Sequence, residues 1–321
     1  MSKFLVTGGA GFIGSHIVEH ILSEGQAVIV LDNFSSGKET NLSFVNESQI
    51  SSKQYCLIKD DIRDYEACLK ACSGVDYVLH QAALRSVPKS MNNPYEYNEV
   101  NIGGTLNMLR AAQQCNVKRF IFASSSSIYG MTDKFPERET DYPLLISPYA
   151  LTKLTGEFYC RIFSENFNLE TVALRYFNVF GPRQAPDDEY AAVIPKFICC
   201  ILKDICPPIF GNGKQSRDFT FVKDVVQANL LAAKIPDISG KVFNIASGSD
   251  NSIVELVAIL NQLAGKSLQP EFLPERAGDV FKTLADISNS KKSLGFKPKF
   301  DFKQGLSLTY DWFCADQSRC R

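Results

Sequence analysis

The sequence predicts an α/β fold in which a doubly wound parallel sheet forms the larger part of the chain and a smaller domain follows it. Three observations lead to this prediction. Short apolar segments alternate with longer amphipathic ones from the first residues onward, a glycine-rich turn follows the first apolar segment, and the regular alternation ends near residue 175. The length of 321 residues accommodates both parts.

Short apolar segments are the predicted strands of this sheet, and amphipathic segments are the predicted helices between them. The strands are residues 4–7, 27–32, 54–59, 77–80, 119–123 and 170–175, and the helices are residues 12–24, 64–72, 95–115 and 148–166. The first helix ends at Gly25, because glycine readily adopts the left-handed conformation found at helix ends. The alternation of strands and helices predicts that the strands run parallel.

The second half of the chain differs from the first in its sequence pattern. Prolines cluster after residue 175, loops lengthen, and isolated helices are expected at 222–234, 253–264 and 303–314. An apolar strand pattern at 242–245 indicates that the chain returns to the sheet. We therefore expect a first domain at 1–175, to which 220–246 returns, and a second domain at 176–219 and 247–321.

The composition excludes several classes of protein. The 34 Lys and Arg nearly balance the 35 Asp and Glu, without long runs of one sign, so nucleic acid and acidic membrane surfaces are poor partners. No apolar stretch approaches the ~18 residues of a membrane span. The 10 cysteines are scattered without a CxxC pair, and the N-terminus shows no secretion leader, so we expect free, mostly buried thiols and a cytoplasmic location.

The turn after the first strand reads TGGAGFIG and carries Gly8, Gly11 and Gly14. This spacing permits a tight turn, the close approach of a pyrophosphate and close packing of a helix, whose N-terminus supplies N–H groups. Asp32 ends the second strand, where a carboxylate would bind the ribose hydroxyls of NAD and repel the 2′-phosphate of NADP. A glycine turn without a ligand is the alternative, but it leaves the matched strand, helix and acid unexplained. The pattern therefore predicts an NAD-binding Rossmann domain at 1–175.

Further residues at the same edge of the sheet are expected to line the NAD site. Asp61 and Ile62 follow the third strand, where adenine would lie, although Asp61 equally suits the N-cap of a helix. Small residues after the fourth strand would let a cofactor pass close by. The residues expected to line this site are Gly8, Gly11, Phe12, Ile13, Gly14, Asp32, Asn33, Ser36, Gly37, Asp61, Ile62, Gln81, Ala82 and Ala83.

Tyr149 and Lys153 are four residues apart on the predicted helix 148–166 and therefore share one face. A lysine ammonium near the phenol, together with a positively charged nicotinamide ring, would lower the phenol pKa from about 10 and make Tyr149 a base. Serines 124–127 end the fifth strand, where hydroxyls would donate to or relay a proton from an alcohol. The alternatives are an exposed tyrosine–lysine pair and a polar loop capped by its own serines.

These motifs resemble those of the extended short-chain dehydrogenase/reductases that act on nucleotide sugars. Within them the chain resembles the UDP-hexose 4-epimerases, in particular the branch that accepts N-acetylated sugars. The likeness covers nearly the whole chain and includes TGGAGFIGS, QAALRSVPKS, SSSSIYG, SPYALTK, LRYFNVFGPRQ, YAAVIPK, SRDF and RAGD.

The resemblance implies a reaction and a catalytic set. Ser125 would be the catalytic hydroxyl, with Ser126 as its substitute, Tyr149 the base, and Lys153 would bind both the ribose of NAD and the tyrosine. The implied reaction passes a hydride from the sugar C4 to NAD and back to the other face of a 4-keto sugar. C4 is thereby inverted without net redox change, and NAD stays bound.

The resemblance also implies the contacts of cofactor and substrate. Phe177 would border the nicotinamide. Arg217 and Arg276 would bind the diphosphate and ribose of a UDP-sugar; the alternative for either arginine is a surface ion pair. Ile209 and Phe210 would lie along uracil. The substrate residues implied are Arg85, Ser86, Ser125, Ser126, Tyr149, Asn178, Ala192, Val193, Ile209, Phe210, Arg217, Arg276, Asp279 and Thr283.

A few positions bear on the sugar. By resemblance, Thr283 and Ala192 leave room for an acetamido group, which favours UDP-GlcNAc and UDP-GalNAc, with UDP-Glc and UDP-Gal also open. Arg85 would suit the C6 carboxylate of a UDP-uronic acid, so an epimerase or decarboxylase of such sugars stays open. Against this, Ala185 stands where glucuronate 4-epimerases carry an arginine. Ser126 and Ser127 replace the Asp-Glu pair of sugar 4,6-dehydratases and disfavour dehydration.

Other readings concern metals, regulation and assembly. The stretch HIVEH at 16–20 matches a zinc-peptidase pattern, but no third ligand stands out, so we expect no metal. An NAD-sensing regulatory protein would keep the glycine turn and typically lack the tyrosine–lysine pair. Helices 95–115 and 148–166 resemble those that pair in dimers of the family, which implies a homodimer.

Overall fold

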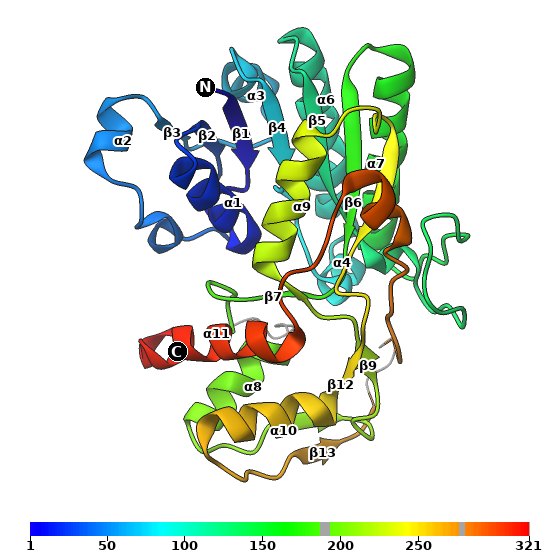
Figure 1. The fold of residues 1–321 in the computed structure, drawn as a ribbon. Coiled ribbons are helices and arrows are strands. Elements are labelled where there is room, and N and C mark those ends of the chain that lie inside the picture. The colour runs from blue at the N-terminus through cyan, green and yellow to red at the C-terminus, as the bar shows by residue number, and fades with distance from the viewer. Residues whose placement is uncertain (187–192, 276–279, 321) are drawn as a thin grey trace.

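The computed structural model describes residues 1–186, 193–275 and 280–320, and its centre is a seven-stranded sheet with helices on both faces (Figure 1). The strand order is β11-β6-β5-β4-β1-β2-β3, and every neighbouring pair is parallel. The strands are β1 (Lys3–Thr7), β2 (Ala27–Leu31), β3 (Tyr55–Ile58), β4 (Tyr77–His80), β5 (Arg119–Ser125), β6 (Glu170–Tyr176) and β11 (Lys241–Ile245). The predicted doubly wound sheet is confirmed, and the strand expected at 242–245 pairs with β6 at the sheet edge.

Helices cover both faces of the sheet and bury it in two separate cores. Helices α1 (Phe12–Ser23) and α9 (Val222–Lys234) pack on one face, and α3 (Tyr65–Cys72), α6 (Thr105–Gln114) and α7 (Pro148–Asn166) pack on the other. In β1, Phe4 and Val6 belong to the first core and Leu5 to the second. A strand buried on both faces must be apolar throughout, which is why these strands are readable as continuous apolar runs.

The helix predicted at 95–115 is interrupted in the structure. It consists of α5 (Pro94–Tyr97), a π-helical turn (Asn98–Gly104) and α6. Within the turn, the Asn101 side chain accepts the N–H of Leu84 at 2.8 Å and donates to its carbonyl oxygen at 3.0 Å. The local widening therefore accompanies a side chain that fixes the loop after β4, a common role of π-helical turns near functional sites.

The rest of the chain gathers below the carboxyl ends of the strands (Figure 1). Helices α8 (Val193–Leu202), α10 (Ile253–Ala264) and α11 (Phe302–Cys314) share a third core. Short strands pair around them: β7 (Val179–Phe180) with β10 (Thr220–Phe221), β9 (Ser216–Arg217) with β12 (Asn251–Ser252), and β8 (Pro208–Phe210) with β13 (Glu271–Leu273). Smaller helical elements are Glu39–Leu42, α2 (Glu47–Ser51), α4 (Val87–Asn92), Ser126–Ile128, Ser290–Leu294 and Gln317–Cys320.

The expectation of free, mostly buried thiols is met only in part: eight cysteines are free, and Cys68, Cys72 and Cys160 among them are buried. Cys199 of α8 and Cys320 near the C-terminus form a disulfide across a sequence separation of 121 residues, which no local pattern indicates. Cys56, Cys206 and Cys314 are exposed rather than buried. In the described parts of the chain, none of the helices is both long enough and apolar enough to cross a bilayer.

Candidate active site

A cavity of about 1800 Å³ is lined by loops that follow the sheet strands and by segments of the C-terminal lobe. It brings together most of the predicted residues. Those that line it are Gly8, Gly11, Phe12, Ile13, Gly14, Asp32, Asn33, Ser36, Gly37, Asp61, Ile62, Gln81, Ala82, Ala83, Arg85, Ser86, Ser125, Ser126, Tyr149, Lys153, Asn178, Arg217 and Thr283. The predicted residues Ala192, Arg276 and Asp279 lie outside the described part of the chain.

The glycine turn packs closely against its neighbouring backbone, because side chains do not fit there, and it lines the cavity. Gly8 has a φ of +65°, and a Cβ atom on it would lie 2.9 Å from the backbone of Ala82. A Cβ atom on Gly14 would lie 2.1 Å from the carbonyl oxygen of Gly8. No side chain caps α1 at Gly11, so the N–H groups of its first turn are left for a ligand. This arrangement suits the pyrophosphate of a dinucleotide.

Asp32 follows β2 at the ribose end of the predicted NAD site. It is buried, and its two oxygens each accept one backbone N–H at 2.8 Å, from Ala10 and Phe34. Burial raises the pKa of Asp32, whereas the two N–H groups lower it. Each oxygen keeps acceptor capacity for a ribose hydroxyl, so this residue and the glycine turn fit NAD.

Asp61 lies on the cavity wall and does not cap a helix. The N-cap of α3 is Asp64, whose side chain accepts two N–H groups of the first turn. Asp61 instead accepts from Asn33 Nδ2 at 2.8 Å and from the guanidinium of Arg63, which lowers the pKa of Asp61 to about 2. Of the two interpretations of Asp61, the structure rules out the N-cap of α3 and leaves a charged group on the cavity wall; its contact with adenine stays a prediction.

Lys153 of α7 lies under the cavity with its ammonium fixed. Its Nζ donates to the carbonyl oxygen of Ala123 at 2.8 Å and stands 5.1 Å from the ring centroid of Phe122. The distance from Nζ to the ring centroid of Tyr149 is 5.9 Å, as the shared helix face predicts. Burial lowers the pKa of Lys153 to about 8, so the charged form still predominates at neutral pH.

The phenol of Tyr149 differs from the expectation in one respect. Burial raises the pKa of Tyr149, while a hydrogen bond with Ser125 and the charge of Arg85 lower it. The expectation is that Lys153 and a bound nicotinamide together lower this pKa; in the protein without NAD, Lys153 is not among the groups that lower it, and for the NAD-bound protein the expectation stays a prediction. A phenol that holds its proton at neutral pH becomes a base only when further positive charge is brought close to it.

The serine loop combines both interpretations of its sequence. Ser125 ends β5, and its Oγ accepts the N–H of Ser127 at 3.2 Å, so the loop does cap its own backbone. The same hydroxyl hydrogen-bonds Tyr149, which brings it to the predicted reaction site. Ser124 is directed elsewhere and donates to Glu157 at 2.5 Å. Ser125 is therefore the serine whose hydroxyl is directed toward the phenol.

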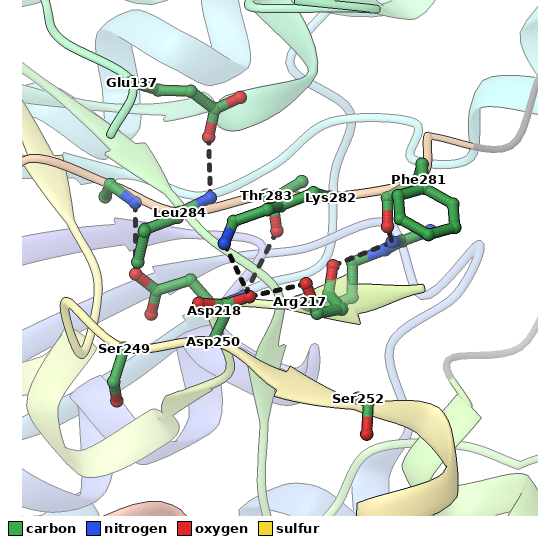
Figure 2. Close-up of polar contacts among 12 residues, drawn as sticks. Glu137, Arg217, Asp218, Ser249, Asp250, Ser252, Phe281, Lys282, Thr283 and Leu284 are labelled. Atoms are coloured by element: carbon green, nitrogen blue, oxygen red, sulfur yellow. Dashed lines mark hydrogen bonds and ion pairs between the residues drawn. The ribbon is translucent and has the colours of Figure 1, made fainter. Parts of the chain in front are cut away.

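The opposite wall of the cavity comes from the segments around β9 and residues 281–284 (Figure 2). Asn178 Nδ2 donates to Thr283 Oγ1 at 2.9 Å, and the N–H of Asp218 donates to the same oxygen at 3.2 Å. Arg217 donates to the carbonyl oxygen of Phe281 at 3.1 Å. These contacts fix the hydroxyl of Thr283 and the guanidinium of Arg217 in the cavity wall.

Some predicted residues do not line this cavity. Phe177 is fully buried and packs on Tyr129 with 5.8 Å between ring centroids, so the expectation that it borders the nicotinamide is not met. Phe177 belongs to a small buried cluster with Tyr129, whereas its neighbours Tyr176 and Asn178 line the cavity wall. Ile209 belongs to the third core, and Phe210 and Val193 are half-buried outside the cavity lining.

The cavity also contains residues that sequence reasoning missed. Arg183 lines it and pairs with Glu19 at 2.6 Å; its place in the quoted GPRQ motif was an available signal. Glu137 lines it as well and accepts the N–H of Leu284, 147 residues away. The segment around Glu137 has no regular pattern, so the sequence carries no signal for this contact.

The histidines of the stretch 16–20 have separate surroundings. A ring nitrogen of His16 lies 2.9 Å from the carbonyl oxygen of Pro182, and burial lowers the pKa of His16 to about 4. His20 is exposed on α1. Within the described residues, no group of three or more His, Cys, Asp or Glu is placed to hold a metal ion.

Comparison with known proteins assigns the family. The model of the NAD dependent epimerase/dehydratase family matches residues 4–246. A putative UDP-glucose 4-epimerase of Methanocaldococcus jannaschii is 37% identical over 310 residues, covering 96% of this chain and 97% of that protein. A UDP-glucuronate 4-epimerase of Thermodesulfobacterium geofontis is 35% identical over 318 residues, covering 97% of this chain and 96% of that protein.

A solved structure extends the likeness to the whole fold. The UDP-N-acetylglucosamine 4-epimerase from Methanobrevibacter ruminantium M1, in complex with UDP-N-acetylmuramic acid, matches with a TM-score of 0.92 at 42% identity and covers 98% of both chains. The glycine turn, Asp32 and the tyrosine–lysine pair lie within the matched residues. The chain therefore belongs to the NAD dependent epimerase/dehydratase family.

Proposed function

We propose that the protein interconverts the C4 epimers of a UDP-sugar, with UDP-GlcNAc and UDP-GalNAc as the preferred pair and UDP-Glc and UDP-Gal as further substrates. The observation that carries the proposal is the convergence of Tyr149, Ser125 and Lys153 on the cavity that also holds the glycine turn and Asp32. A proton-transfer group, a hydroxyl and an NAD site in one cavity suit the oxidation and re-reduction of a single alcohol carbon.

Each residue has a separate task in this reaction. Tyr149 would take the proton of the 4-hydroxyl and later return it, while Ser125 would bind the same oxygen through the hydroxyl that already meets the phenol. Lys153, held 2.8 Å from the carbonyl oxygen of Ala123, would keep a positive charge beneath the site. When bound, NAD would supply the hydride acceptor and donor at C4 and the extra positive charge that the phenol requires.

The sugar has to be inferred from this chain's own wall, because the three relatives are named for glucose, glucuronate and N-acetylglucosamine. Thr283 is small, and its hydroxyl is occupied by Asn178, which supports space for an acetamido group beside it. Arg85 supports the alternative, a UDP-uronic acid 4-epimerase or decarboxylase, because its charge reaches Tyr149. Ala185 lines the cavity and supplies no cation for such a carboxylate.

The test is a panel of UDP-sugars incubated with the purified protein, without added reductant, followed by separation of the products. UDP-GlcNAc should give UDP-GalNAc, and the reverse reaction should reach the same mixture. UDP-glucuronate separates the alternatives, since an epimerase yields UDP-galacturonate and a decarboxylase releases carbon dioxide. A folded protein that retains NAD and converts none of these sugars would contradict the proposal and favour a sensor.

We also infer that the protein forms a homodimer through α7. Leu151, Phe158 and Ile162 are 51%, 55% and 44% exposed. Their spacing of seven and four residues places them on one face of the helix. A row of exposed apolar side chains on one helix face supports contact with a second copy.

A further inference from the structure

Glu137 is a buried acid in the cavity wall, and the reaction outlined above gives it no task. The residue is 1% exposed, yet it lines the cavity. Its Oε2 accepts the N–H of Leu284 at 3.2 Å, as Figure 2 shows. Its other oxygen, Oε1, has no hydrogen-bond partner among the residues that the structure describes. Because the residue lines the cavity, Oε1 is available to a ligand there.

The backbone fixes the position of this carboxyl group. The segment that carries Glu137 begins at Gly130, where a Cβ atom would lie 1.6 Å from the carbonyl oxygen of Leu144. Farther along, the N–H of Glu137 donates to the carbonyl oxygen of Leu284 at 2.7 Å, and the N–H of Asp286 donates to that of Glu137 at 2.8 Å. The side chain is therefore placed by main-chain bonds that do not depend on its own carboxyl group.

Glu137 lines the same cavity as Ser125 and Tyr149, and a series of contacts connects its segment with theirs. Ser125, which meets the phenol of Tyr149, is the register partner of Tyr176 across β5 and β6. Asn178, two residues after Tyr176, donates its side-chain amide to Thr283. Leu284, which follows Thr283, donates its backbone N–H to Glu137. These contacts connect the segment of Ser125 with that of Glu137, and both residues line the same cavity, which supports a place for the hexose near the carboxyl group.

The surroundings favour the protonated acid. Burial raises the pKa of Glu137 to about 8, and the charges of Asp218 and Asp141 raise it further in the same direction, whereas the N–H of Leu284 and the charge of Arg217 lower it. Asp218 follows β9 and has its own pKa raised to about 6 by burial. At neutral pH Glu137 therefore presents an O–H donor, and above pH 8 it presents a negative charge.

We propose that Glu137 is a specificity-determining residue that hydrogen-bonds an uncharged polar substituent of the hexose and disfavours a carboxylate there. A hydroxyl or an amide carbonyl accepts the proton of the acid. A uronic acid carboxylate at the same place would meet the negative field of Asp218 and Asp141. The inference rests on the proposed function and deepens it, because it selects neutral UDP-sugars over UDP-uronic acids.

The test measures dissociation constants by calorimetry in the NAD-loaded Tyr149→Phe protein, in which turnover of the ligands should be strongly slowed. The ligands are UDP-GlcNAc, UDP-glucuronate and UDP, which lacks the hexose. Glu137→Leu should weaken UDP-GlcNAc by about three- to tenfold, the usual value of one hydrogen bond, and should change UDP by less than about twofold. The preference for UDP-GlcNAc over UDP-glucuronate should narrow accordingly.

A pH series isolates the proton. With Glu137 present, the affinity for UDP-GlcNAc should fall above pH 8, approaching tenfold per pH unit once the acid ionises. Glu137→Gln keeps an acceptor for the N–H of Leu284 and a donor for the sugar that does not ionise. In this variant the loss of affinity caused by Glu137 should therefore vanish, and only the loss caused by Lys153 and other titrating groups should remain. Because Gln matches the size of Glu, this arm decides the question even if Glu137→Leu folds poorly.

Glu139→Gln is the matched control. Glu139 lies in the same segment and accepts the backbone N–H of Asn244 at 2.9 Å, but it does not line the cavity. If the Glu137 variants shift sugar affinity and its pH profile no more than Glu139→Gln does, the inference is wrong. If the protein folds and holds NAD but neither binds nor converts UDP-sugars, the proposed function itself has failed, which is a different result.

Discussion

The ammonium of Lys153 donates to the carbonyl oxygen of Ala123 at 2.8 Å, at the end of the strand that carries the serine loop. This bond links α7 to β5 and holds the charge at the cavity, with Nζ 5.9 Å from the ring centroid of Tyr149. Lys153 is thus suited to bind the ribose of NAD and to supply charge to the site. In the protein without NAD, the charge of Arg85 lowers the phenol pKa while burial raises it.

Lys153→Met should lower kcat for UDP-GlcNAc epimerisation by about a hundredfold or more and weaken NAD retention, because the charge is lost while the stem keeps its packing. Turnover and bound NAD per chain are the measurements. Lys118→Met is the control, since Lys118 pairs with Asp76 on the surface at 2.9 Å. Equal NAD content and equal kcat in both variants would show that Lys153 has no part in the site.

Tyr149→Phe should abolish proton transfer and reduce kcat by about 10²–10⁴-fold, the usual contribution of a general base. The ring keeps its edge-on contact with Tyr97, whose centroid lies 6.4 Å away, so the fold and NAD content should be retained. Because burial raises the pKa of this phenol, kcat/KM of the normal enzyme should rise from pH 6 toward pH 9. A flat profile, with the phenylalanine variant still active, would remove Tyr149 from the chemistry.

Asp32→Asn should reduce the preference for NAD over NADP. The change removes the negative charge that repels a 2′-phosphate and turns one acceptor of a backbone N–H, from Ala10 or Phe34, into a donor. We expect NAD to bind about tenfold more weakly, since one buried N–H loses its partner. Fluorescence titration of both nucleotides measures the change, with Asp133→Asn at an exposed site as the control. An unchanged ratio of the two affinities would contradict this role.

The elements that the sequence predicts correctly are those whose pattern is local. Residues 27–31 of the predicted strand 27–32 are all apolar because β2 is buried on both faces, and the turn with Gly8 is recognisable because side chains are sterically excluded there. The NAD end of the cavity was predictable for the same reason, since its residues follow one another at the ends of successive strands.

The residues that were misplaced depend on contacts between distant segments. The helix 95–115 is interrupted where Asn101 binds Leu84, and Phe177 turns into a small core shared with Tyr129. Glu137 reaches the cavity only because residues 137 and 284 meet. Helical or strand periodicity does not predict contacts between residues so far apart in the sequence. The residues of the proposed substrate site were therefore less predictable than those of the NAD site.

Phe158→Lys should convert the proposed dimer into a monomer, because a charge at the centre of the apolar face formed with Leu151 and Ile162 would be desolvated on association. Light scattering after size-exclusion chromatography measures the mass. Tyr142→Lys is the control, since Tyr142 is 83% exposed and lies outside α7. A normal protein that is monomeric at micromolar concentration, or a Phe158 variant that stays dimeric, would place the interface elsewhere or remove it.

His80 should make the protein sensitive to acid. Its ring lies between Thr7 Oγ1 at 2.8 Å and Thr105 Oγ1 at 3.0 Å, and burial lowers the pKa of His80 to about 3. The unfolded chain takes up this proton near pH 6.5 and the folded chain only near pH 3, so the free energy of unfolding should fall as the pH drops between these values. The limiting slope is about 1.4 kcal/mol per pH unit for one proton.

Urea denaturation of cofactor-saturated protein at pH 7, 6, 5 and 4.5 measures this slope of the free energy of unfolding. His80→Asn should remove that share of the slope, whereas His20→Asn on the exposed face of α1 should keep it. If His80→Asn and the normal protein lose stability in parallel, acid must act through other groups.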